Sequence, residues 1–328
     1  MKIIFKGKHI ADIRISHYIK CHCLIVVICF MAIAHLFFNI TCAKAEDNSS
    51  LKIGFTASVY QDVSNTDIKA AVSVLIKKVA WKHFEKAESR FYDTLSEMAT
   101  DLKNRKIDIL ATPVEEYMEL RKQLPIDPLL ISSAENGTEM EILLVVRKDS
   151  GIRTIRDLKG RSIVMPLRNP RCLDMYIAWL ETMLMEEGGK GINSYFSSVK
   201  ETRTSAKAIM PVFFRQADAC IVTRQVLELT AELNPQINRE LMIISRKGKL
   251  SQGIIAVDRR LSEERKEKLR QAFLTLHQTP EGQQLLMLFK VRKLVPFIPG
   301  YMKGTEALYA EHSRQKNMIA GRHLGMSK

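Results

Sequence analysis

The strongest constraint on the fold is an alternation of short apolar runs with amphipathic runs, which begins at Leu51 and continues to Phe289. Short apolar runs bounded by turn residues predict buried strands, and apolar residues at helical spacing predict helices. Strands that alternate with helices are typical of an α/β fold with largely parallel sheets, covered by helices on both faces. We therefore expect an α/β protein.

The expected elements follow one another without an internal repeat or a low-complexity segment. The predicted strands are Leu51–Phe55, Ile107–Ala111, Glu141–Arg147, Ser162–Pro166, Tyr195–Val199, Ala219–Thr223, Leu241–Ser245 and Gly253–Val257. The predicted helices are Ile68–Glu85, Tyr92–Asn104, Leu173–Glu187, Ser205–Gln216, Thr223–Glu232, Ser262–Gln278 and Pro280–Phe289.

The N-terminus has the pattern of an export signal. Basic residues precede an apolar run, Cys23–Ile40, which is followed by Ala43-Lys44-Ala45. A basic segment, an apolar core and an Ala-x-Ala site are typical of a secretory signal peptide. This predicts a signal peptide over residues 1–45, cleavage after Ala45, and a periplasmic or other extracytoplasmic location. A retained membrane anchor is the alternative, because the apolar run is close to the shortest that spans a bilayer.

The charge of the chain is basic with or without this leader. Residues 1–45 contain six of the 50 basic residues and one of the 36 acidic ones, so the remainder carries 44 minus 35, or +9. Long lysine or arginine runs, zinc fingers and RNA-binding motifs are missing from the sequence, which argues against nucleic acid as a partner. In an exported protein the charge fits an anionic ligand or a nearby membrane surface.

No catalytic constellation stands out in the sequence. The histidines are scattered, His-Glu-x-x-His and Gly-x-Ser-x-Gly motifs are missing, and no run has metal-ligand spacing. The glycine-rich run Glu187–Gly191 lacks the Ser or Thr that follows the lysine of a P-loop. We therefore expect a protein that is not an enzyme and that needs neither a cofactor nor a metal.

A specific resemblance lies at Val145–Met165, VVRKDSGIRTIRDLKGRSIVM. It is similar to the segment that crosses from lobe one to lobe two in type II periplasmic solute-binding proteins. Other segments match in family order: LKIGF, LKNRKIDIL, FFRQADACIV and LSEERKEKLRQAFLTLHQTPEGQQLL. Over Leu51–Pro299 the chain resembles the phosphate, phosphite and phosphonate substrate-binding proteins of ABC transporters.

The resemblance implies two Rossmann-like lobes joined by a two-strand hinge. Lobe one would comprise residues 46–146 and 253–328, and lobe two residues 147–252. Ligands bind such folds between the lobes, at the carboxyl ends of strands, and closure traps them. The implied function is that of a monomeric extracytoplasmic protein that captures a small anionic or zwitterionic ligand for the membrane permease of an ABC transporter. The alternative is a ligand-sensing module that acts on a membrane sensor kinase or receptor.

Four loops would then reach the ligand, because each follows the carboxyl end of a strand. The candidate ligand-binding residues are Thr56, Ser58 and Tyr60 in the first loop, Thr112 and Glu115 in the second, Arg168, Asn169 and Arg171 in the third, and Thr223 and Arg224 in the fourth. Hydroxyl and guanidinium groups donate hydrogen bonds to oxyanions. Ordinary turn and helix-cap roles, with the arginines at the surface, are the alternative.

The loops depart from the family pattern in ways that bear on the ligand. Thr112 and Glu115 stand where the family has a Gly-Pro-x-Ser-like sequence, and a carboxylate there repels a phosphonate. Glu115 and Glu116 are equally compatible with a role as helix-start acids. Arg168 and Arg171 replace a Ser/Thr/Gly-rich turn, beside Asn169 as an expected N-cap. The third loop therefore favours a ligand with a negative group, whereas the second weakens phosphonate in particular.

Two cysteines, Cys172 and Cys220, remain after the leader. In an oxidising compartment they are compatible with a disulfide, and equally with two buried thiols.

Overall fold

The computed structural model describes residues 49–60, 65–134, 137–167, 169, 172–189, 191–203 and 206–325, without the side chains of 59–60, 65–68 and 322–325. The predicted signal peptide, residues 1–45, lies outside this part of the chain. Within it, no helix has both the length and the apolar character needed to span a membrane.

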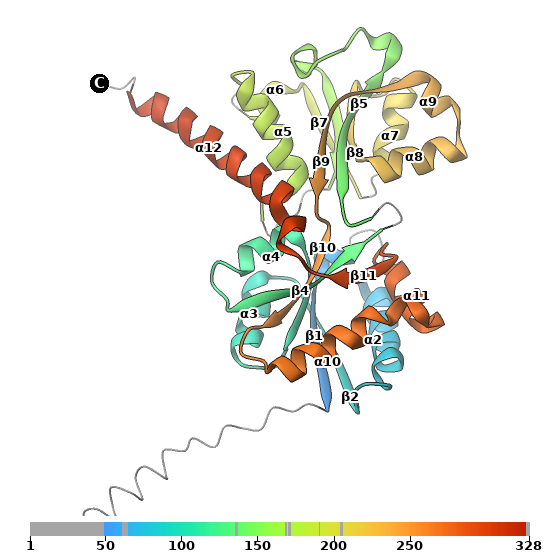
Figure 1. Cartoon of the computed structure of the whole chain (residues 1–328). Helices are drawn as coiled ribbons and strands as arrows, with labels where there is room; N and C mark the ends of the chain where they lie inside the picture. The colour runs from blue at the N-terminus through green and yellow to red at the C-terminus, as the bar shows by residue number, and fades with distance from the viewer. Residues whose placement is uncertain are drawn as a thin grey trace, which may run out of the picture. The chain divides into compact units, whose positions relative to one another are not determined.

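The first sheet has six strands in the order β11-β4-β10-β3-β1-β2 (Figure 1). The strands are β1 (Ser50–Thr56), β2 (Lys86–Tyr92), β3 (Ile109–Pro113), β4 (Ile126–Ser133), β10 (Gly253–Asp258) and β11 (Lys293–Pro296). β1 runs parallel to β2 and β3, whereas β10 is antiparallel to β3 and β4. The edge strand β2 alternates partly exposed with exposed residues, so it lacks the apolar run by which a buried strand is recognised.

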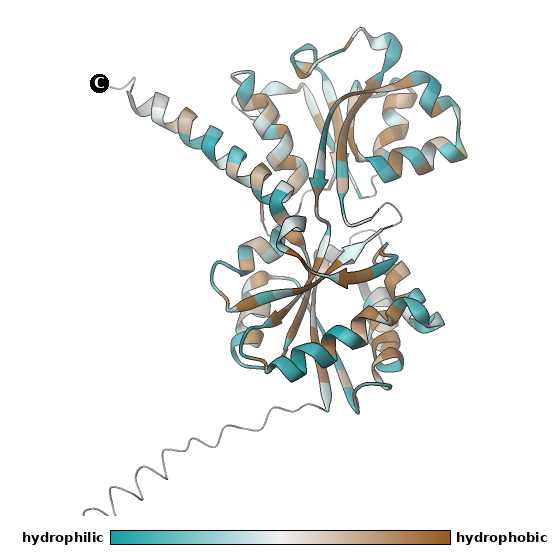
Figure 2. Ribbon diagram, viewed as in Figure 1, coloured by the Kyte–Doolittle hydropathy of each residue, from teal (hydrophilic) through white to brown (hydrophobic). Residues whose placement is uncertain are grey.

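Helices cover both faces of this sheet because its central strands are apolar on both sides. On one face Ile53, Phe55 and Ala111 pack with α2 (Asn65–Ala80), α10 (Glu263–Leu274) and α11 (Pro280–Leu288). On the other face Leu110 and Ile254 pack with α3 (Leu95–Lys103) and α4 (Val114–Leu120). The apolar colour in Figure 2 accordingly concentrates in the strands, while the helices show hydrophilic outer sides.

The second sheet has five strands in the order β7-β6-β8-β5-β9. They are β5 (Met140–Arg147), β6 (Ser162–Pro166), β7 (Ser198–Thr202), β8 (Ala219–Thr223) and β9 (Leu241–Leu250). One face packs against α5 (Met175–Glu186) and α6 (Ile192–Tyr195), and the other against α7 (Ala206–Phe213), α8 (Arg224–Leu233) and α9 (Gln236–Glu240). This is the two-sheet α/β architecture that the sequence predicts.

Several details differ from the sequence predictions. Strands β6 and β8 have the predicted bounds. Both sheets are mixed and not largely parallel, because β10 runs antiparallel to β3 and β4 in the first sheet and β5 runs antiparallel to β8 and β9 in the second. The strand predicted at Tyr195–Val199 starts only at Ser198, after the short helix α6. The helix predicted at Ile68–Glu85 ends at Ala80, because β2 follows. The elements β2, β4, β11, α6, α9 and α12 (Lys303–Gly325) had no counterpart in the predictions, and α4 was anticipated only by the interpretation of Glu115 and Glu116 as helix-start acids.

The lobe limits also differ from those inferred from the sequence. Strand β5 lies in the second sheet, although lobe one was expected to reach residue 146. Helix α12 packs along α5, where the hydroxyl of Tyr309 donates to the carbonyl oxygen of Leu173 at 2.7 Å, and His312 lies 2.7 Å from Glu181 (Figure 1). Near its start α12 also pairs with α4, through Glu306 and Arg121 at 2.8 Å. The C-terminal helix therefore contacts helices that cover each of the two sheets.

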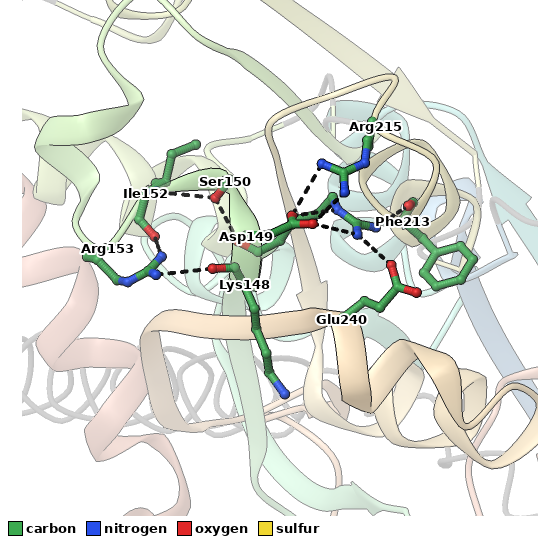
Figure 3. Close-up of polar contacts among 9 residues, drawn as sticks. Lys148, Asp149, Ser150, Ile152, Arg153, Phe213, Arg215 and Glu240 are labelled. Atoms are coloured by element: carbon green, nitrogen blue, oxygen red, sulfur yellow. Dashed lines mark hydrogen bonds and ion pairs between the residues drawn. The ribbon is translucent and has the colours of Figure 1, made fainter.

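The R-K-D-S-G part of the family-like motif has a structural role (Figure 3). Arg147, at the end of β5 and 8% exposed, donates to Asp149 at 2.9 Å and to the carbonyl oxygen of Phe213 at 2.5 Å, and it pairs with Glu240 at 2.5 Å. The hydroxyl of Ser150 donates to the carbonyl oxygen of Arg147 and closes the turn. β5 starts beside the carboxyl end of β8 and runs antiparallel to it, so this network lies at the opposite end of the sheet from Thr223.

Candidate functional site

The candidate site forms where loops that follow strand ends of both sheets meet. Strand β1 leads into the short helix η1 (Ala57–Tyr60), β3 leads directly into α4, and β6 precedes the loop before α5. The carboxyl ends of strands are where open α/β sheets place their ligands. Three of the four predicted loops contribute side chains to one hydrogen-bonded group here.

Glu116 is the centre of this group. Its Oε1 accepts hydrogen bonds from the hydroxyl of Ser58 at 2.6 Å and from the side-chain amide of Asn169 at 2.9 Å. The hydroxyl of Thr56 lies 3.0 Å from that of Ser58. Glu116 is fully buried, and no described residue bonds its second oxygen, Oε2. Because a buried carboxylate oxygen without a donor is costly, this atom is suited to an N–H or O–H donor from a ligand.

Glu115 precedes Glu116 in the first turn of α4, as the helix-start interpretation expects. Its side chain is partly exposed, but Oε2 is buried and has no partner within the described part of the chain. Burial, together with the smaller effect of the negative charges of Asp174 and Glu116, raises the pKa of Glu115 to about 8. Near neutral pH, much of the population therefore carries this carboxyl group in its protonated form.

Thr112, the next candidate, lies one residue before the end of β3 and is almost fully buried. Its hydroxyl oxygen makes no hydrogen bond to any of the described residues. After Glu116 and Glu115, Thr112 is therefore a third residue near the start of α4 with a buried polar atom whose hydrogen bonding is incomplete.

Asp174 organises the third loop. Its Oδ1 accepts from the backbone N–H of Ile177 at 2.8 Å, and its Oδ2 accepts from the backbone N–H of Asn169 at 3.0 Å. Asp174 is thus the N-cap of α5, and the prediction that Asn169 caps this helix is wrong. The carboxylate caps the helix more effectively from the position directly before it. The side-chain amide of Asn169 is instead available to bond Glu116.

Three predicted contacts lie where the structure says nothing. Arg168 and Arg171 are outside the described residues, and so is the side chain of Tyr60. Their proposed role in holding a negative group remains a prediction.

Thr223 and Arg224 form a separate polar group. The hydroxyl of Thr223 accepts from the backbone N–H of Val226 at 3.4 Å and caps α8. Arg224 pairs with Glu141 at the start of β5 and with Glu228 one turn along α8, at 3.5 Å. Both residues line a polar pocket together with Glu139, Lys249 and Gln252. Since Glu141 already neutralises Arg224, this residue is a weaker anion contact than its sequence position suggests.

The two cysteines are free thiols, so the structure contradicts a disulfide. Cys220 lies on β8, buried with Val145 and Val164 on the face that packs against α7 and α8. The chain after Cys172 packs against the opposite face, through Leu173 and α5. Burial raises the pKa of both thiols, and Glu115 and Glu116 raise that of Cys172 further.

The residue that sequence reasoning missed is Glu116. It was considered only as a helix-start acid, because the comparison with the family pattern placed the neighbouring Glu115 at the ligand-binding position of the second loop. Among the described residues, no group of three or more His, Cys, Asp or Glu side chains is arranged to hold a metal ion.

The fold has two mixed sheets covered by helices, and loops at the strand ends of both sheets meet at a buried polar group. This arrangement is that of a two-lobed binding protein of the type II periplasmic class. The chain belongs to the family described as ABC transporter, phosphonate, periplasmic substrate-binding protein, whose sequence profile matches residues 53–299. The resemblance seen in the sequence is thereby confirmed. No curated protein matches the sequence.

Solved structures share the fold. A Xanthomonas citri protein bound to ATP is 17% identical, with a TM-score of 0.58, over 82% of this chain and 98% of that one. A binding protein component of an ABC phosphonate transporter from Pseudomonas aeruginosa is 16% identical, with a TM-score of 0.57, over 82% of this chain and 88% of that one. PhnD1 from Prochlorococcus marinus, in complex with methylphosphonate, is 16% identical, with a TM-score of 0.56, over 80% of this chain and 97% of that one.

Proposed function

We propose that this member of the family captures a small zwitterion, a molecule that carries both an amine and an oxyanion, at the group formed by Ser58, Glu116 and Asn169. The observation that carries the proposal is the buried carboxylate of Glu116. Its Oε1 accepts hydrogen bonds from side chains of two other loops, whereas its Oε2 accepts none from the described residues. An ammonium group is the donor that best complements such an oxygen, since hydrogen bonds between charged groups are the strong ones.

A purely anionic ligand fits this group less well. A phosphonate within a few ångströms of Glu116 would be repelled by the carboxylate, and the low dielectric of a buried site strengthens that repulsion. The oxyanion of the ligand therefore belongs farther from Glu116. The predicted contacts of Arg168 and Arg171 supply positive charge for it, and so does the helix N-terminus that follows them.

The remaining parts of the function rest on family membership and on the sequence. The ligand is presented to the membrane permease of an ABC transporter after the protein has been exported by the signal peptide at residues 1–45. The protein acts as a monomer, and lobe closure supplies contacts to the ligand that the open form lacks.

Isothermal titration with matched ligand pairs tests the proposal. Each pair consists of an ω-aminoalkylphosphonate, or the corresponding aminocarboxylate, and the compound of the same length that lacks the amine. Tighter binding of the amine-bearing member in at least one pair is expected. Equal or tighter binding of the amine-free member in every pair would contradict a zwitterion site, while leaving the family assignment intact.

A further inference from the structure

A second surface of the first lobe combines an exposed tryptophan with lysines, and the binding site does not use it. Trp81 follows the end of α2 and is 70% exposed. It shares two surface hollows with His83, Lys78, Lys82 and Lys268, and Lys77 lies in the last turn of α2. We call these six residues the Trp81 patch.

The patch is cationic, although acidic residues border it. Lys77, Lys78 and Lys82 form no ion pair with any residue that the structure describes. The ammonium group of Lys268 lies 4.9 Å from the centre of the Phe84 ring. Glu85 and Glu281 line the same hollows, so the positive charges outnumber the negative ones.

The position of the patch along the chain links it to the N-terminus. Ser49, the first described residue, lines the same hollow as Trp81 and His83. Its carbonyl oxygen accepts from the backbone N–H groups of Glu85 at 2.8 Å and Lys86 at 3.3 Å, which fixes the chain beside the patch.

We infer that the Trp81 patch is a membrane-contact surface whose partner is an anionic phospholipid bilayer. Tryptophan is enriched at the level of lipid headgroups, where its ring is apolar and its N–H is hydrated. Lysines near an anionic leaflet each contribute about 1 kcal/mol of attraction. Such contact holds the protein near the membrane where a permease lies, and it also accounts for positive charge that the cleft does not use.

Tryptophan fluorescence tests this inference directly, because the chain has two tryptophans and Trp179 is buried. The protein is expressed with its leader, so that the host processes it as it normally does, and the purified product is mixed with vesicles whose acyl chains are brominated. With phosphatidylglycerol and phosphatidylcholine together, we expect a blue shift and quenching of Trp81. Phosphatidylcholine alone should give neither. Trp81→Phe should leave only an unquenched signal from Trp179.

Charge variants complete the test. Lys78→Glu with Lys82→Glu should weaken partitioning to the anionic vesicles at least about 30-fold. The matched control, Lys200→Glu with Lys207→Glu, makes the same charge change on the second lobe and should retain the quenching. The inference fails if Trp81 is not quenched by anionic vesicles, if phosphatidylcholine alone quenches it equally, or if the control pair weakens binding as much as the patch pair.

Discussion

Replacement of Glu116 by glutamine separates the charge of this side chain from its shape. In the wild-type protein, Oε1 accepts from Ser58 and Asn169. In Glu116→Gln these two donors hold the amide oxygen in the same place, so the new NH2 group occupies the position of Oε2. A ligand ammonium group would then face a donor instead of a negatively charged acceptor.

The magnitude follows from the bond that is lost. A hydrogen bond to a charged group contributes about 1.5–3 kcal/mol. Loss of that contribution weakens binding about 10- to 150-fold. The amine-free ligand of the same length makes no such bond, so its affinity should stay within about threefold of wild type or improve as the repulsion disappears.

The assay is the same titration with both members of a matched ligand pair. Glu119→Gln serves as the control, because Glu119 lies on the same helix but is bonded to Lys122. Equal losses for both ligands in Glu116→Gln would show that the substitution disturbs the cleft generally. Unchanged affinity for the amine-bearing ligand would refute the assignment of Glu116 to the amine.

Three further predictions concern pH and stability, and each is measured by denaturant unfolding. The pKa of Glu115 is raised from 4.5 to about 8 in the folded protein, so its contribution to stability is full below pH 4.5 and is lost as the pH rises through about 8. Glu115→Gln should remove this pH-dependent part of the free energy of unfolding, which is of the order of a few kcal/mol. Unaltered pH dependence in that variant would contradict the burial of the carboxyl group. Tyr309→Phe removes the hydrogen bond from α12 to the loop before α5 and should cost about 1–3 kcal/mol. Gly304→Ala would place a Cβ 1.9 Å from the carbonyl oxygen of Lys249 and should lower the free energy of unfolding by about 1–3 kcal/mol. The control on the same helix, Gly321→Ala, meets no atom and should raise the free energy of unfolding by about 0.5–1 kcal/mol. Equal effects of the two substitutions would mean that α12 does not dock as described.

The sequence predicts those elements whose burial makes them continuously apolar. Strands β6 and β8 are buried on both faces, and their bounds match the predictions. Strand β2 is an edge strand with a polar sequence, so periodicity gave no signal for it. Helix α12 is long but mostly polar, and its position depends on contacts with α5 that only the tertiary structure reveals.

Two residues of the candidate site were also predicted from the buried strands, because their loops follow strand ends. Strand ends indicate which loops meet, and Ser58 and Asn169 were found in this way. Which neighbouring acid faces inward depends on one residue of register, and Glu116, not Glu115, accepts the two hydrogen bonds. The ion pair between Arg224 and Glu141 joins residues far apart in sequence, so the neutralisation of that arginine could not be read from either loop alone.

The most direct test of the central claim is native mass spectrometry of the processed protein, purified without refolding. Capture of a small zwitterion between the lobes predicts a non-covalent adduct of low molecular mass on the wild-type protein. The adduct should be lost or strongly reduced in Asn169→Ala, which removes a donor that positions Glu116. An equally abundant adduct on wild type and Asn169→Ala, or a wild-type protein that carries no adduct and acquires none from the matched ligand panel, would contradict the account.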